Sequence, residues 1–113
     1  MNYFTTTFLE EAKEFLEGLD AKSAAKLLYI IDAAEQTNDP KLFKKLNGEI
    51  WEFRNKYLGK QNRLLAFWDK TDGKETLVIA THGFIKKSKK TPSKEIDKAK
   101  ALRQLYFSNK SNK

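Results

Sequence analysis

The stretch IWEFRNKYLGKQNRLLAFW, residues 50–68, decides the fold. Over residues 50–57, aromatic and charged side chains alternate. The aromatic set is Trp51, Phe53 and Tyr57, and the charged set is Glu52, Arg54 and Lys56. A period of two places alternate side chains on opposite faces, so residues 50–57 predict a β-strand. The almost unbroken apolar run at residues 63–68 predicts a central strand, reached through a turn at residues 59–62.

The residues on either side of this stretch predict further strands and turns. Asp72-Gly73 is a hairpin signal and leads to a third predicted strand at residues 76–82, which completes an antiparallel meander. Gly83 is expected to let the chain bend away from the sheet. On the other side, residues 42–46 predict a short helical turn that leads into Asn47-Gly48.

Residues 1–40 predict a helical hairpin. Thr7 is expected to cap a first helix that ends near Gly18, and Asp20 a second one that Pro40 stops. The expected buried sides recur at helical spacing: Phe8, Ala12, Phe15, Leu16 and Leu19 in the first helix, and Ala24, Leu27, Leu28, Ile31 and Ala34 in the second.

Thr91-Pro92 is expected to start a last helix, with Thr91 as the cap. Its buried side would be Ile96, Ala99, Leu102 and Tyr106. The predicted fold class is therefore α+β: an N-terminal helical hairpin, a twisted antiparallel sheet of three to four strands, and a C-terminal helix. Residues 1–107 are expected to form a single domain, and residues 108–113 a polar flexible tail.

Composition restricts the function. The 113 residues carry a net charge of +7, divided as −5 over residues 1–40, +4 over 41–83 and +8 over 84–113. A basic second half indicates a polyanionic partner such as nucleic acid, although lysine-rich surfaces also keep small proteins soluble. The chain has no cysteine and a single histidine, which exclude a disulfide scaffold, a thiol nucleophile, a Cys-ligated zinc and a two-imidazole site. No leader or membrane-spanning segment is recognisable in the sequence, so we expect a cytoplasmic protein.

Four cationic residues are expected to converge on one surface of the sheet. Arg54 and Lys56 share a strand face, Arg63 opens the neighbouring strand, and Lys86 follows the third strand. Arginine binds phosphate oxygens in a fixed geometry, and a lysine crowded by cations loses its proton more readily, so this set could cleave RNA without a metal or cofactor. The alternative is that the alternating charges are simply solvated.

Other candidates are weaker. His82 is interpreted as a hydrogen-bonded structural residue. It lies at the end of an apolar strand, and the period of two places it on the same face as Val78 and Ala80. Glu52 is interpreted as a salt-bridge partner of the cations rather than a base. Tyr57 and Phe84, at strand ends, are the candidates for stacking on a base.

Three segments resemble the phage-derived HigB-like toxins of the RelE/ParE superfamily. Residues 46–54 (LNGEIWEFR) resemble "L-x-x-x-[LI]-[WY]-E-[LF]-R", residues 62–67 (NRLLAF) resemble "Y-R-[IV]-[LF]-[YF]", and residues 82–92 (HGFIKKSKKTP) are similar to "H-G-F-x-K-K-[ST]-x-K-T-P". Asn62 stands where many relatives have an aromatic residue. The C-terminal tyrosine with which some RelE toxins stack a base has no clear counterpart.

The resemblance implies the toxin of a type II toxin–antitoxin pair. Such toxins are ribosome-dependent endoribonucleases that cut mRNA in the A site without a metal and leave a 2′,3′-cyclic phosphate. By position, the catalytic residues would be Arg54, Lys56, Arg63 and Lys86, and Lys87, Lys89 and Lys90 would contact RNA. The implied partners are the ribosome, mRNA and a helix-turn-helix, HigA-like antitoxin, with operator DNA reached only through the antitoxin complex.

Two alternative functions belong to other classes of protein. A ParE-like protein would share the scaffold but inhibit DNA gyrase by binding. A non-catalytic basic module would bind RNA with strong salt dependence and never cut it.

Overall fold

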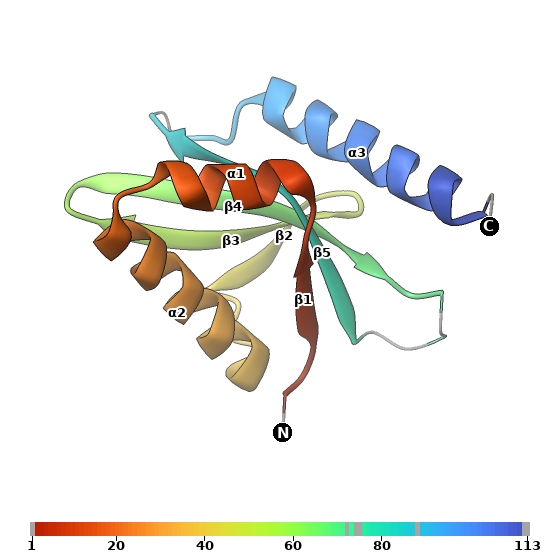
Figure 1. The fold of residues 1–113 in the computed structure, drawn as a ribbon, viewed down its shortest axis with the longest axis horizontal. Coiled ribbons are helices and arrows are strands. Elements are labelled where there is room, and N and C mark those ends of the chain that lie inside the picture. Colours follow the sequence, from red (N-terminus) through yellow and green to blue (C-terminus); the bar gives the residue numbers. More distant parts are fainter. Residues whose placement is uncertain (1, 72, 74–75, 88, 112–113) are drawn as a thin grey trace.

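The computed structural model describes residues 2–71, 73, 76–87 and 89–111 (Figure 1). A five-stranded sheet and three helices make up this part of the chain. In chain order they are β1(Thr5–Phe8), α1(Glu10–Gly18), α2(Ala21–Thr37), β2(Phe43–Asn47), β3(Ile50–Tyr57), β4(Lys60–Asp69), β5(Leu77–Lys86) and α3(Ser93–Ser111). The α+β class, the helical hairpin and the C-terminal helix are as predicted from the sequence.

The strand order is β1-β5-β4-β3-β2. The predicted meander is confirmed, because β3, β4 and β5 pair antiparallel in that order. Two edge strands enlarge the expected sheet of three to four strands. β2 pairs antiparallel with β3, whereas β1 pairs parallel with β5, so the sheet is mixed rather than wholly antiparallel.

The N-terminal edge strand corrects the prediction of a helix that begins at Phe8. The run Thr5-Thr6-Thr7 is β-branched, which favours extended backbone, and β1 pairs with β5 from Thr5 against Leu77 to Phe8 against Ala80. Thr7 therefore lies in a strand and caps nothing. Helix α1 begins at Glu10 behind Leu9, which offers no side-chain cap.

The second edge strand corrects the helical turn predicted at residues 42–46. Phe43 pairs with Phe53 of β3 and is 1% exposed, whereas Lys44 and Lys45 face solvent. Stacking of the Phe43 ring on Phe53, at 4.2 Å between centroids, stabilises the pairing. Pairing with the neighbouring strand β3, rather than the local sequence of residues 42–46, thus decides the conformation of this short segment.

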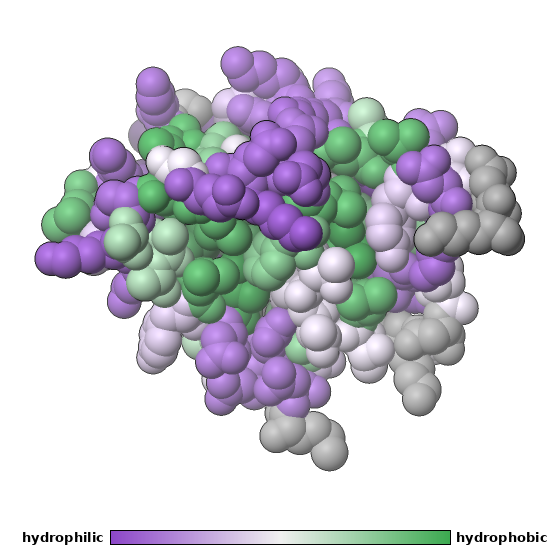
Figure 2. All heavy atoms as spheres, in the orientation of Figure 1, coloured by the Kyte–Doolittle hydropathy of each residue, from purple (hydrophilic) through white to green (hydrophobic). Residues whose placement is uncertain are grey.

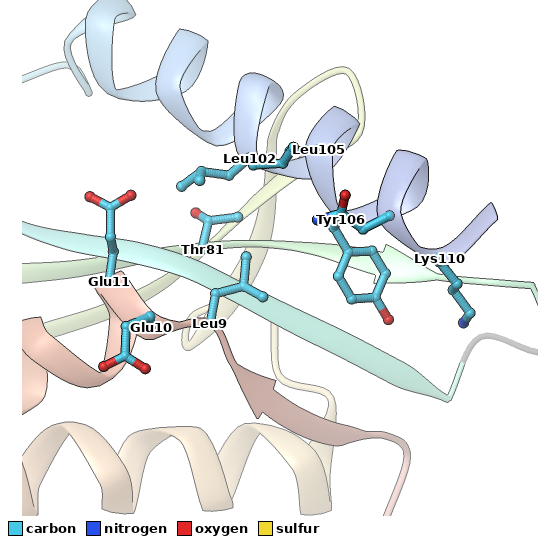
Figure 3. Close-up of a pocket in the computed structure, with 9 residues that line it drawn as sticks. Leu9, Glu10, Glu11, Thr81, Leu102, Leu105, Tyr106 and Lys110 are labelled. Carbon is cyan, nitrogen blue, oxygen red and sulfur yellow. The ribbon is translucent and has the colours of Figure 1, made fainter. Parts of the chain in front are cut away.

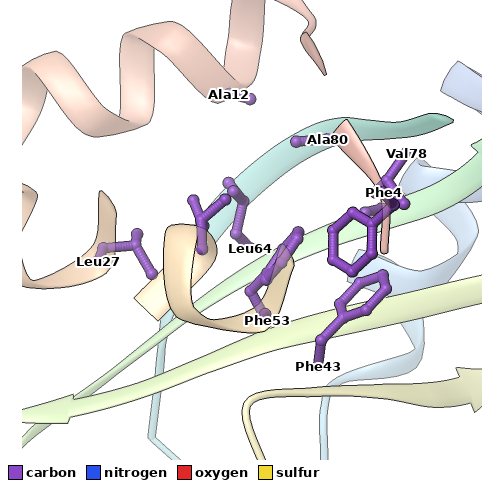
Figure 4. Packing of buried hydrophobic residues seen from close by; sticks show 11 residues of the cluster. Phe4, Ala12, Leu27, Phe43, Phe53, Leu64, Val78 and Ala80 are labelled. Carbon is purple, nitrogen blue, oxygen red and sulfur yellow. The ribbon is translucent and has the colours of Figure 1, made fainter. Parts of the chain in front are cut away.

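Helices cover both faces of the sheet. The α1–α2 hairpin packs on one face, over a core that includes Phe4, Phe43, Phe53 and Leu64 (Figure 4). Helix α3 packs on the other face, which we call the α3 face, against residues such as Ile50, Leu65 and Phe67.

Helix boundaries agree in part with the sequence prediction. Asp20 caps α2 by accepting a hydrogen bond from the Ser23 amide, and Asn38 ends that helix in the left-handed conformation. Leu28, expected to be buried, is 46% exposed, because the buried side of α2 runs through Ser23, Leu27, Ile31 and Ala34.

The C-terminal helix also departs from expectation at both ends. Thr91 does not cap α3, because its hydroxyl donates to Glu52 instead, and the helix begins at Ser93. The helix continues to Ser111, well into the segment predicted as a tail, and residues 112–113 lie outside the described part. Within the described residues, no helix is long and apolar enough to cross a membrane.

Candidate functional site

Strand pairing arranges the candidate residues in cross-strand rows on the α3 face. From β3 through β4 to β5, the first row is Glu52, Leu65 and His82, the second is Arg54, Arg63 and Phe84, and the third is Lys56, Gln61 and Lys86. Side chains directly opposite one another in antiparallel strands lie about 5 Å apart at Cβ. Arg54, Arg63 and Lys86 are therefore brought together, as the sequence predicted.

The tight turn between β3 and β4, together with a β5 that is longer than predicted, produces this arrangement of rows. The β3–β4 turn consists of Leu58 and Gly59, both at positive φ, so β4 already begins at Lys60 and the turn is shorter than predicted. Strand β5 does not bend away at Gly83 but continues to Lys86, which is how Lys86 joins the sheet surface.

Glu52 is the buried counter-charge of the two arginines. Its carboxylate lies 3.4 Å from Arg63 Nε and 3.8 Å from Arg54 Nε, and only 2% of its side chain is exposed. The Thr91 hydroxyl donates to Glu52 Oε1 at 3.0 Å, which ties the segment before α3 to the cluster. The interpretation of Glu52 as a salt-bridge partner is confirmed.

Arg63 lies beneath the surface, with 5% of its side chain exposed. Nη1 donates to the Asn62 carbonyl at 3.1 Å and Nη2 to Gln61 Oε1 at 2.8 Å, so the guanidinium plane is fixed. Burial and then Arg54 lower the pKa of Arg63, while Glu52 opposes the change. Arginine remains protonated in proteins, so Arg63 is a fixed positive charge under the site.

Lys86 is the titratable member of the cluster. Burial first, and then the charges of Arg63, Arg54 and Lys44, lower the pKa of its ammonium group, while Glu52 acts in the opposite direction. A lowered pKa makes the neutral amine, which can accept a proton, available closer to neutral pH. The expectation that neighbouring cations would lower this pKa is met.

A surface hollow of about 800 Å³ opens at Arg54 and Lys86, and we call it the cationic hollow. It is lined by Arg54, Gly59, Lys60, Gln61, Ile85, Lys86, Lys87 and Lys89. Lys60 and Gln61 were not predicted, although Gln61 shares the parity of Arg63 in the sequence. With its several ammonium groups and one guanidinium, the hollow is suited to bind a phosphate-bearing polyanion.

The remaining predicted residues are placed less centrally. Lys56 is exposed in the same row as Lys86, and Phe84 is half-buried beside Arg63. Lys90 follows Lys89 outside the lining of the hollow. Tyr57 alternates with Lys56 along β3, so it faces the opposite side of the sheet from Arg54 and Lys56.

His82 is held on both ring nitrogens. Nε2 lies 3.1 Å from Glu95 Oε1 of α3, and Nδ1 lies 3.1 Å from the Thr81 hydroxyl. A bulge at Thr81 turns His82 to the α3 face, away from Val78 and Ala80, which corrects the predicted shared parity. Burial lowers the pKa of His82 despite the hydrogen bond to Glu95. The interpretation of His82 as a hydrogen-bonded residue is confirmed by these two contacts.

Among the residues that the structure describes, no group of three or more His, Cys, Asp or Glu side chains could hold a metal ion.

Fold and site together define a small α+β protein with a cationic hollow on a sheet flanked by a basic segment. The chain belongs to the family of phage-derived Gp49-like proteins (DUF891), whose model matches residues 14–104. Its fold is similar to that of a chain in the RelBE2 toxin–antitoxin complex of Mycobacterium tuberculosis, with a TM-score of 0.57 and 17% identity. That similarity covers 74% of this chain and 98% of the other. No curated protein matches the chain.

Proposed function

We propose that this chain is a HigB-like toxin of a type II toxin–antitoxin system, a ribosome-dependent endoribonuclease that acts in the cytoplasm on mRNA in the ribosomal A site. The observation that carries the proposal is the pairing of Arg54 with the buried Arg63 across β3 and β4, with Arg54 and Lys86 both lining the cationic hollow. Membership of the Gp49-like family and the RelE-type fold support it.

In the proposed reaction, Arg54 binds a non-bridging oxygen of the scissile phosphate, and Arg63 beneath it stabilises the charge that develops in the transition state. Lys86, as the neutral amine, accepts the proton of the ribose 2′-OH. The 2′-oxygen attacks phosphorus, the bond to the 5′-oxygen breaks, and that oxygen takes up a proton from water, while Lys86 later releases its proton to solvent. The products are a 2′,3′-cyclic phosphate and a 5′-hydroxyl, with no metal or cofactor involved.

Partners follow from the same proposal. Lys87, Lys89 and Lys90 contact the RNA backbone, and the ribosome positions the substrate, because so sparse a site needs external alignment. A helix-turn-helix, HigA-like antitoxin neutralises the toxin, and operator DNA is bound only through that complex. Lys56 remains a proposed catalytic residue, and Phe84 remains a proposed RNA-binding residue. Tyr57 is retained only as an RNA contact outside the hollow.

The test is primer extension on a reporter mRNA, with translating ribosomes present and absent. Wild type is compared with Lys86→Ala and with Lys100→Ala, which removes an exposed lysine of α3 outside the hollow. We expect codon-phased cuts that need both the ribosome and Lys86 and that Lys100→Ala leaves unchanged. Growth arrest without cuts would contradict the proposal and favour the gyrase inhibitor. RNA binding without cuts under any condition would favour the non-catalytic module.

A further inference from the structure

A second concave surface lies away from the cationic hollow, where the start of α1 meets the exposed side of α3. This α1–α3 groove has a volume of about 460 Å³ (Figure 3). It is lined by Leu9, Glu10, Glu11, Thr81, Leu102, Leu105, Tyr106, Asn109 and Lys110. None of these residues lines the cationic hollow, so the two surfaces are separate.

Leucines form the middle of the groove. Leu105 is 56% exposed, and Leu9 and Leu102 are half-buried around it. In Figure 3, Leu102 and Leu105 extend from α3 and Leu9 approaches from the start of α1. Figure 2 shows hydrophobic surface beside the hydrophilic side chains that cover α1. Contiguous apolar surface with a polar rim is typical of a protein-docking site.

Charge at the two ends of the groove is unequal. Glu10 and Glu11 stand at one end, in the first turn of α1, and Glu11 is paired with Lys98 of α3 at 2.6 Å. At the other end, Lys110 is already bound to the buried carboxylate of Asp69 at 2.7 Å. The acidic end therefore retains negative charge, mainly on exposed Glu10, and this favours a basic protein segment over RNA.

We propose that the α1–α3 groove is the docking surface for an amphipathic helix of the antitoxin. Apolar side chains of that helix contact Leu102 and Leu105, and a lysine or arginine of the helix faces Glu10. A helix lying in a groove with a few apolar anchors is a common mode of peptide recognition. The inference rests on the proposed function, because it specifies where the antitoxin of that function binds.

The first test measures binding of the antitoxin that the proposed function assigns to this chain, by isothermal titration calorimetry with both proteins at full length. We compare Leu105→Lys with Leu28→Lys, because both place a lysine at an exposed helical leucine and Leu28 lies on α2, outside the groove. Leu105→Lys is expected to weaken binding by about 30-fold, as for a central interface residue, and Leu28→Lys by less than about 3-fold. Equal affinities of the two variants, or no binding by wild type, overturn the proposal.

A second pair of variants tests the charge. Glu10→Gln is expected to weaken binding by about 5-fold at low salt and by less at high salt, whereas Glu17→Gln, at the other end of α1, leaves it unchanged. An unchanged affinity in Glu10→Gln overturns the assignment of a basic segment to this end.

A growth assay separates the docking surface from the proposed function. Leu105→Lys should arrest growth as wild type does, yet no longer be rescued by co-expressed antitoxin. If Leu105→Lys loses rescue but still binds the antitoxin, the proposed docking surface is wrong. If wild type makes no cuts in mRNA, the proposed endoribonuclease activity is wrong, and the affinities measured for the antitoxin still stand.

Discussion

The Glu52 carboxylate and the Arg63 guanidinium form a buried ion pair, with Oε1 3.4 Å from Nε and side chains that are 2% and 5% exposed. The same carboxylate faces Arg54 and accepts the Thr91 hydroxyl. It also opposes the effect of the surrounding cations on the pKa of Lys86. Glu52 is thus a positioning residue that orients two arginines and limits how far the pKa of Lys86 falls.

Glu52→Gln keeps the side-chain shape and removes its charge. Because Arg63 then lacks its buried counter-charge, we expect a loss of about 3 kcal/mol in the free energy of unfolding. The pKa of Lys86 should fall further, so the pH at which cleavage reaches half its maximum should move to lower pH. Cleavage rates against pH measure this shift, and Glu49→Gln, which removes an exposed carboxylate, is the control. An unchanged pH profile with lowered stability would reduce Glu52 to a structural residue.

Arg54 is open enough to be removed without emptying the core, since 35% of its side chain is exposed. Arg54→Ala should reduce ribosome-dependent cleavage by about 100-fold, the usual effect of losing one donor to a developing charge. Arg54→Lys keeps the charge but not the two-pronged geometry, so we expect an intermediate loss. Lys45→Ala, an exposed cation of β2, should cleave as wild type does. Full activity in Arg54→Ala would contradict the assigned site.

The cationic cluster was predictable because a period of two determines which side chains share a face. That rule alone placed Arg54 and Lys56 on one face of the strand and Tyr57 on the other face. The structure has the same arrangement. The position of His82 could not be obtained in this way, because one extra residue at the Thr81 bulge reverses the alternation and no local residue pattern marks it.

The two edge strands were missed for a related reason. Residues 5–8 and 43–47 are short, and their conformation depends on pairing with another strand: β1 with β5, which lies far away in sequence, and β2 with β3, which follows it. Apolar residues in so short a segment fit a helical turn as well as a strand. Thr91 likewise carried a correct local signal for a helix cap, but the buried Glu52 carboxylate competes for its hydroxyl.

Gly83 is required by the close approach of α1 to β5. A Cβ at this position would lie 2.2 Å from Cδ2 of Phe15, so Gly83→Ala should lower the free energy of unfolding by about 2 kcal/mol. Gly18→Ala is the matched control, because a Cβ there meets nothing within 4 Å and α1 should be unchanged or slightly more stable. Urea unfolding measures both, and adding Phe15→Leu should restore part of the loss. Equal stability of the two alanine variants would contradict the packing argument.

Acid should destabilise the fold in two separate pH ranges. Burial lowers the pKa of His82 below 6.5, so the unfolded chain binds its proton first and stability falls as pH decreases below about 6.5. Burial alone would raise the pKa of Asp69, but hydrogen bonds from Lys110, Tyr106 and Thr71 outweigh it and hold that pKa below 3.8. Its stabilisation is present above pH 3.8 and is lost as pH falls further.

Urea unfolding at a series of pH values separates these two groups. His82→Gln should flatten the slope of stability against pH around pH 6, and Asp69→Asn should flatten it below pH 4. If His82→Gln left the slope around pH 6 as in wild type, another group would be responsible for it. Burial and then the hydrogen bond to Asp69 raise the pKa of Tyr106 to about 12. Asp69→Asn should therefore lower this pKa part of the way toward its ordinary value, which a spectrophotometric titration at alkaline pH detects.

Leu58 is the strained residue of the β3–β4 turn. It has φ of 53° and is 79% exposed, so a side chain that disfavours left-handed backbone is held there without burial to compensate. Asparagine tolerates this conformation and is favoured in such two-residue turns. Leu58→Asn should therefore raise the free energy of unfolding by about 1 kcal/mol and the melting temperature by about 4 °C.

The control for this exchange is the same substitution in a helix. Leu28→Asn, at an exposed position of α2, should lower stability by about 0.5 kcal/mol, because asparagine is a poorer helix former than leucine. Opposite signs for the two exchanges would show that backbone conformation, rather than the loss of an exposed leucine, decides the effect. A lower melting temperature in Leu58→Asn would mean that the Leu58 side chain makes a contact worth more than its backbone strain.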